Sequence, residues 1–142
     1  MLFRRVFTSG LNAVRSFSVS RQLLGNLSPE LKTKIQGLVE QGDVVLFMKG
    51  SPDQPMCGFS KTAKMILEFH QIPFKSVNVL ADEDVREGIK EFSDWPTIPQ
   101  LYVKGQFVGG SDILLQMHKD GEITQVFEDN GIKSKFSDQD KI

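Results

Sequence analysis

Apolar residues repeat every three or four positions in five segments of the chain, which is the spacing of helices with one buried face. The first of these segments begins with Ser28-Pro29-Glu30, an N-cap followed by a first-turn proline and acid, and it stops before Gly42. Asp82 to Asp84 open another segment with acids that suit a helix N-terminus. The expected helices lie within residues 28–41, 59–72, 82–92, 111–117 and 123–130.

Between these helices the apolar pattern changes to that of strands. Residues 44–48 are wholly apolar, which predicts a short strand buried on both faces. Residues 73–80 alternate, and residues 101–103 and 106–108 flank a turn at Lys104-Gly105 in the manner of a hairpin. The order is helix, strand, helix, strand, helix, hairpin, helices. This order predicts an α/β protein with a mixed four-stranded sheet that helices flank on both faces.

Charge is unevenly distributed along the 142 residues, whose net charge is −1. Residues 1–29 carry four arginines and no acid, so the remaining residues carry a net charge of −5. An acidic folded part disfavours nucleic-acid binding, and no apolar run approaches the roughly 20 residues that span a bilayer. We expect one domain over residues 26–132, followed by a flexible C-terminal tail over residues 133–142.

The basic N-terminal segment has the composition of a mitochondrial transit peptide. Residues 1–25 are rich in arginine and serine, and their apolar residues gather on one side of a helix. The run Arg15-Ser16-Phe17-Ser18 resembles matrix-processing sites, which predicts cleavage near residues 17–21. The alternative interpretation is a basic arm without a targeting role. Import would place the mature protein in the mitochondrial matrix.

Cys57 is the only cysteine, and it lies in "MKGSPDQPMCGFSK" between the first strand and the next helix. A thiol at a helix start favours the thiolate, which attacks disulfides and binds metals. An inert buried cysteine is the alternative, although the flanking Pro55 and Gly58 indicate an exposed turn. Ser60, which we expect to cap the first turn, stands where a Cys-x-x-Cys motif would have its second thiol. The chain therefore forms no internal disulfide, although Cys57 occupies the place of a thioredoxin-like redox site.

Four motifs in register resemble those of the CGFS-type monothiol glutaredoxins. They are "CGFS" at 57–60, Lys49, "WPTIPQ" at 95–100 and "GGSD" at 109–112, and the resemblance covers roughly residues 30–132. It implies a thioredoxin-like (glutaredoxin) fold and a glutathione-dependent [2Fe–2S] cluster carrier in mitochondrial iron–sulfur cluster assembly. A thiolate-held cluster needs four thiolates, and this chain supplies one. The resemblance implies a homodimer in which two Cys57 thiolates and two glutathione molecules hold one bridging cluster.

The resemblance also implies a glutathione site. Lys49 would meet a glutathione carboxylate, Arg86 occupies the position of the family's basic residue for the glycyl carboxylate, and Lys90 would assist. A cis peptide before Pro99 would leave backbone groups free for the tripeptide, and a helix start after Gly110 suits an anion. Solvated side chains are the alternative for all three cations, and a trans bond is the alternative for the proline. The predicted glutathione site comprises Lys49, Arg86, Thr97, Ile98, Pro99, Gly110, Ser111 and Asp112, and the predicted metal ligand is Cys57.

A second function uses the same residues. Cys57 would then work as a glutathione-dependent thiol–disulfide oxidoreductase through a mixed disulfide. The long lead "KGSPDQPM" argues against high activity, because extra residues there would turn bound glutathione away from an attacking orientation. The resemblance further implies a mitochondrial Hsp70 chaperone, BolA-like proteins and later cluster assembly factors as partners. We expect no nucleic-acid partner, no membrane partner and no cluster ligand at His70 or His118.

Overall fold

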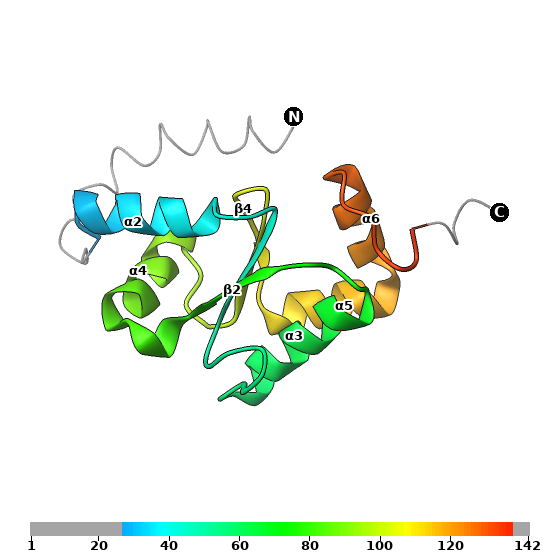
Figure 1. Ribbon diagram of the computed structural model, residues 1–142, viewed down its shortest axis with the longest axis horizontal. Helices are drawn as coiled ribbons and strands as arrows, with labels where there is room; N and C mark the ends of the chain where they lie inside the picture. The colour runs from blue at the N-terminus through cyan, green and yellow to red at the C-terminus, as the bar shows by residue number, and fades with distance from the viewer. Residues whose placement is uncertain (1–26, 138–142) are drawn as a thin grey trace.

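The structure is a computed structural model that describes residues 27–137, and Figure 1 shows a central sheet between two groups of helices. The predicted transit peptide and its cleavage region lie outside the described residues, as do residues 138–142. Within residues 27–137 no helix has the length and apolarity needed to cross a membrane.

The sheet has four strands in the order β2-β1-β3-β4. β1 (Val44–Met48) pairs in parallel with β2 (Lys75–Asn78) and antiparallel with β3 (Gln100–Val103), which forms an antiparallel hairpin with β4 (Gln106–Gly109). Lys104 and Gly105 both have positive φ, as a two-residue hairpin turn of type I′ requires. The predicted mixed sheet and hairpin are therefore confirmed.

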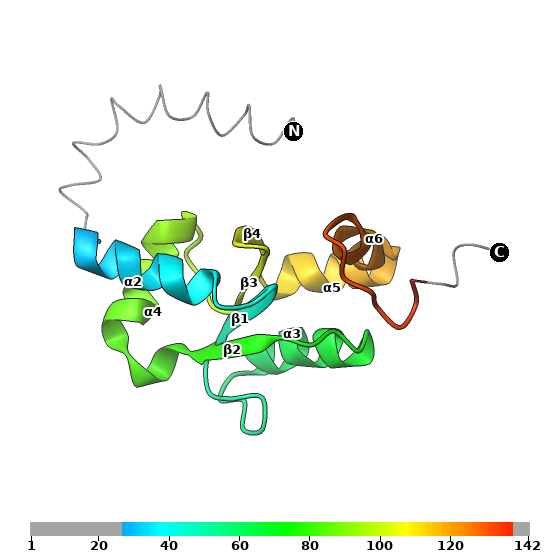
Figure 2. The same ribbon diagram turned by 45° about the horizontal axis from the view of Figure 1, so that its top comes forward.

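Within residues 27–137, five α-helices cover the two faces of the sheet (Figures 1 and 2). α2 and α4 pack beside each other on one face, and α3, α5 and α6 cover the other. Ser28 caps α2 by accepting a hydrogen bond from Leu31 N at 3.1 Å. Asp82 caps α4 by accepting hydrogen bonds from the backbone N–H groups of Asp84 and Val85. Their bounds are α2 Pro29–Val39, α3 Gly58–Phe69, α4 Glu83–Ser93, α5 Ser111–Asp120 and α6 Glu122–Asp129.

β1 lies at the centre of the protein because every one of its residues is buried. Successive side chains of a strand point to opposite faces, so Leu46 and Met48 pack with α3, α5 and α6, whereas Val45 and Phe47 pack with α2 and α4. An apolar strand between two helical layers needs no polar face. This strand ends immediately before Lys49. It therefore places the start of the loop of residues 49–56, which leads to Cys57, at the edge of both cores.

Two elements differ from the sequence-based expectation. The second strand ends at Asn78, and Val79–Ala81 form a short 3-10 helix, η1. Asn78 causes this change because its side-chain oxygen accepts a hydrogen bond from Leu80 N at 3.0 Å and turns the chain. α5 continues to Asp120, three residues beyond the expected end at residue 117, and Gly110 is its N-cap, without a capping side chain.

The C-terminal segment was predicted to be flexible from residue 133, but residues 133–137 pack against the end of α3. Lys135 N donates to His70 O at 2.8 Å. Phe136 stacks on Phe69 with 5.3 Å between the ring centroids, and Ser137 is buried. The first half of the predicted tail is therefore part of the folded domain.

Candidate functional site

Cys57 is the N-cap residue of α3 and adopts an extended backbone conformation there. Its thiol is only partly buried. The pKa of this thiol is lowered from its ordinary value, chiefly by a hydrogen bond from the backbone N–H of Ser60. The N–H of Phe59 and the charge of Lys49 act in the same direction, whereas partial burial opposes them. The helix start thus favours a nucleophilic and metal-binding thiolate, as the sequence predicts.

Ser60 is fully buried and does not cap α3. Its hydroxyl oxygen accepts a hydrogen bond from Lys49 N–H at 3.0 Å, which ties the first turn of α3 to the end of β1. The same hydroxyl also helps to lower the pKa of the Cys57 thiol. The expected role as a first-turn cap was therefore wrong. The serine instead connects the two chain segments that flank the thiol.

Replacing Ser60 with alanine is expected to make Cys57 less acidic and the fold less stable. The loss of the hydroxyl removes one group that stabilises the thiolate, so the pH profile of thiol alkylation shifts to higher pH and the rate at neutral pH falls. The partly buried Lys49 N–H also loses its acceptor, which costs at most about 1–3 kcal/mol. Iodoacetamide kinetics against pH and urea denaturation measure the two effects. A superimposable pH profile would show that the hydroxyl does not act on the thiol.

The loop between Lys49 and Cys57 closes on itself. Met56 N–H donates to Lys49 O at 2.9 Å, and Ser51 and Gln54 exchange backbone hydrogen bonds across the tip. Gly50 has a φ of 91°, and a Cβ atom there would overlap Gln54 O and lie 2.8 Å from Met56 N. Glycine is therefore required at this position. The closed loop sets where Cys57 enters α3.

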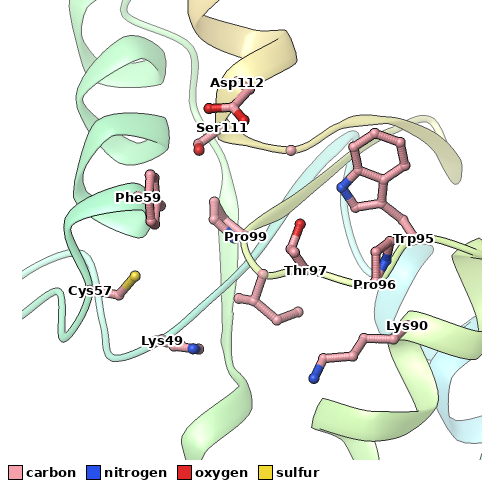
Figure 3. Close-up of a pocket in the computed structure, with 12 residues that line it drawn as sticks. Lys49, Cys57, Phe59, Lys90, Trp95, Pro96, Thr97, Pro99, Ser111 and Asp112 are labelled. Carbon is pink, nitrogen blue, oxygen red and sulfur yellow. The ribbon is translucent and has the colours of Figure 1, made fainter.

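An open cavity of about 390 Å³ adjoins Cys57 (Figure 3). Every residue of the predicted site except Arg86 lines this cavity. Figure 3 shows the Cys57 sulfur and the Lys90 amine entering the cavity from opposite sides, with Ser111 and Asp112 along a third side. The lining residues are Lys49, Cys57, Phe59, Lys90, Trp95, Pro96, Thr97, Ile98, Pro99, Gly110, Ser111 and Asp112.

The segment immediately before β3, residues 95–99, lines the cavity. The Ile98–Pro99 peptide bond is cis, as predicted. Gln100 is fully buried, and its side-chain amide donates to Trp95 O at 3.0 Å and to Thr97 O at 3.2 Å. Gln100 thereby holds the lining segment against the sheet. This glutamine belongs to the "WPTIPQ" motif, but the sequence alone does not indicate its role.

The start of α5 presents backbone N–H groups to the cavity. No side chain caps this helix, and Gly110, Ser111 and Asp112 all line the cavity. A Cβ on Gly110 would lie 3.0 Å from Trp95 Nε1 and 3.3 Å from Pro99 O, so glycine permits the close approach of these segments. Unpaired N–H groups and the helix dipole make such a terminus suitable for an anion.

The two cations expected on α4 are placed differently. Lys90 lines the cavity, and its amine lies 3.5 Å from Glu87 Oε2. Arg86 does not line it, and its guanidinium lies 3.5 Å from Glu83 Oε2 on the same helix. Lys49 and Lys90 are therefore the cations that a ligand in this cavity meets in this structure.

Residues 27–137 contain no group of three or more His, Cys, Asp or Glu side chains that could hold a metal ion. His70 and His118 lie together, with His70 Nε2 and His118 Nδ1 2.9 Å apart, but they are at the end of α3 opposite Cys57. The candidate metal ligand near the cavity is Cys57, the one thiol of the chain.

A sheet of this order with a thiol between β1 and α3 defines a protein with the thioredoxin-like fold of glutaredoxins. A family model described as Glutaredoxin matches residues 44–108. The solution structure of reduced poplar apo GrxS14 superposes with a TM-score of 0.65 at 48% identity, covering 75% of this chain and 97% of that one.

Two curated relatives are similarly close. Glutaredoxin-related protein 5, mitochondrial, of Danio rerio is 52% identical over 108 residues, covering 75% of this chain and 70% of the relative. Monothiol glutaredoxin-5, mitochondrial, of Schizosaccharomyces pombe is 50% identical over 115 residues, covering 79% and 78%. The chain belongs to the monothiol glutaredoxin family.

Proposed function

We propose that this protein carries a [2Fe–2S] cluster in the mitochondrial matrix, using glutathione as a second source of thiolates. The observation that carries the proposal is the isolated Cys57 thiol, whose lowered pKa favours a ligand but which has no second cysteine in the chain. A cluster held by four thiolates then needs thiols from outside the chain. Two mitochondrial relatives support the location.

The chemistry of the cavity fits glutathione, which has two carboxylates, an ammonium group and an extended peptide backbone. Lys49 and Lys90 supply cations on two sides. The uncapped start of α5 would bind the carboxylate of the γ-glutamyl end, and Asp112 would meet its ammonium group. Thr97 to Pro99 would lie along the peptide backbone, and Arg86, one turn before Lys90, is a candidate to assist at the glycyl carboxylate.

In this scheme the cluster is cargo. Two protomers supply two Cys57 thiolates, two glutathione molecules supply the other two, and the cluster bridges the homodimer. Loss of glutathione opens the iron coordination, which suits transfer to a recipient protein. The cluster-loaded homodimer would meet a mitochondrial Hsp70 chaperone, BolA-like proteins and later assembly factors.

Reconstitution of the full chain without oxygen tests this function. We expect iron, sulfide and visible absorbance only when glutathione or a similar thiol is present, with two irons per dimer. The loaded protein is expected to sediment as a dimer and the metal-free chain as a monomer. A cluster that assembles equally well without any small thiol would overturn the proposal.

The lowered pKa of Cys57 also favours a second candidate function, thiol–disulfide exchange. The thiolate would attack a glutathione mixed disulfide, release the substrate thiol and keep glutathione as a disulfide on Cys57. A second glutathione would then reduce Cys57 and leave as glutathione disulfide. Turnover of a glutathionylated peptide by iron-free protein, without any cluster on reconstitution, would favour this second function.

A further inference from the structure

The buried Gly50 N–H depends on a side chain that is 28 residues away in the sequence. Gly50 is buried, and its N–H donates to Asn78 Oδ1 at 3.0 Å. The same oxygen accepts from Leu80 N at 3.0 Å. Asn78 is itself largely exposed, so its exposure would suggest a freely replaceable surface residue. Its carbonyl oxygen instead satisfies two backbone donors from two different segments.

These two segments meet where the Cys57 loop leaves the sheet. Asn78 pairs with Met48 at the end of the parallel β1–β2 ladder, directly before Lys49 and Gly50. The backbone of Lys49 and Gly50 is therefore held from two sides, by Ser60 Oγ at one N–H and by Asn78 Oδ1 at the next.

The connection continues to the thiol in two further steps. Lys49 O accepts from Met56 N–H at 2.9 Å, which fixes the residue immediately before Cys57. Lys49 also lines the cavity beside Cys57. A shift of the backbone at Gly50 would therefore move both the entry to Cys57 and the cation beside it.

We propose that Asn78 is a positioning residue for the reactive thiol, acting through the closed loop of residues 49–56. Asn78 does not line the cavity, so it acts on the thiol through other residues. By anchoring Gly50 it keeps Lys49 beside Cys57 and keeps Met56 in place. The proposal concerns the metal-free thiol, so it stands whether the site carries a cluster or exchanges disulfides.

Asn78→Leu in the full chain tests the anchor, because leucine has a similar size but no acceptor. We expect the Gly50 amide to exchange with solvent about tenfold faster. The Cys57 alkylation rate at neutral pH is expected to fall by about threefold, the size of effect that a partly exposed charge interaction gives, and its pH profile shifts to higher pH. Amide hydrogen exchange by NMR and iodoacetamide kinetics give the two readouts.

Asn130→Leu is the matched control, because Asn130 also makes a side-chain hydrogen bond to backbone, to Val126 O at the end of α6. It is expected to leave both readouts unchanged. Asn78→Asp retains the acceptor and is expected to restore the protection of the Gly50 amide. At high salt, which screens the added charge, the Cys57 alkylation rate is expected to return to the wild-type value as well.

Asn78→Ser decides the matter if the leucine variant does not fold. Its oxygen is one bond nearer the backbone, so it can still cap Leu80 N–H but is too short to hold Gly50 as well. We expect the same faster Gly50 exchange and slower alkylation as for leucine. A folded leucine or serine variant with wild-type Gly50 exchange, or with a wild-type alkylation profile, would overturn the proposal.

Discussion

Replacing Cys57 with serine is expected to abolish cluster binding and leave the fold intact. The hydroxyl is nearly the size of the thiol but stays protonated at neutral pH, so it does not replace a thiolate ligand. Cys57 is only partly buried and belongs to neither apolar core, so we expect little change in stability. Iron content and visible absorbance after anaerobic reconstitution with glutathione measure the loss, and urea denaturation measures stability.

Met65→Ser is a suitable control, because it introduces serine at an exposed position of the same helix, two turns from the thiol. This variant is expected to take up iron like the wild type. Normal iron in purified Cys57→Ser would mean that the thiolate is not the ligand, whereas loss of iron together with loss of the folded state would leave stability as the cause. The two measurements together separate these cases.

The features that sequence predicted well are those set by near neighbours in the chain. Ser28 and Asp82 lie within three residues of the N–H groups that they cap. The apolar run of β1 reports directly that both faces of the strand are covered, because each residue contributes to one of two adjacent cores. Such signals need no knowledge of the tertiary structure.

The features that sequence missed depend on partners that only the fold brings together. Ser60 meets Lys49 N–H from 11 positions away, and Asn78 meets Gly50 N–H from 28 positions away. A serine in a first turn and an asparagine at the end of a strand have ordinary local roles, capping and turn formation. Their additional long-range bonds leave no trace in spacing or composition.

The two cations of α4 show a similar limit within one helix. Arg86 and Lys90 are four positions apart and share a face, so periodicity does not distinguish them. They differ by about 6 Å along the helix axis, and the cavity lies at the level of Lys90. The resemblance to the family singled out Arg86, whereas the depth of the cavity along α4 could be known only from the structure.

Lys49→Ala is expected to raise the glutathione concentration needed for cluster assembly by roughly ten- to hundredfold. Lys49 lines the cavity beside Cys57 and offers a cation to a glutathione carboxylate. A hydrogen bond to a charged group is worth about 1.5–3 kcal/mol, and each 1.4 kcal/mol or so changes an equilibrium tenfold. Iron per dimer against glutathione concentration measures the change.

Lys61→Ala is the matched control, since this lysine is exposed on the first turns of α3 and does not line the cavity. It removes the same charge near Cys57 and is expected to leave the glutathione requirement unchanged. Lys49 also favours the thiolate, so the plateau of the titration separates its two roles. If Lys49 binds glutathione, saturating glutathione restores full iron. If it acts only through the thiol, the plateau falls while the midpoint stays in place, and its assignment to the glutathione site would be wrong.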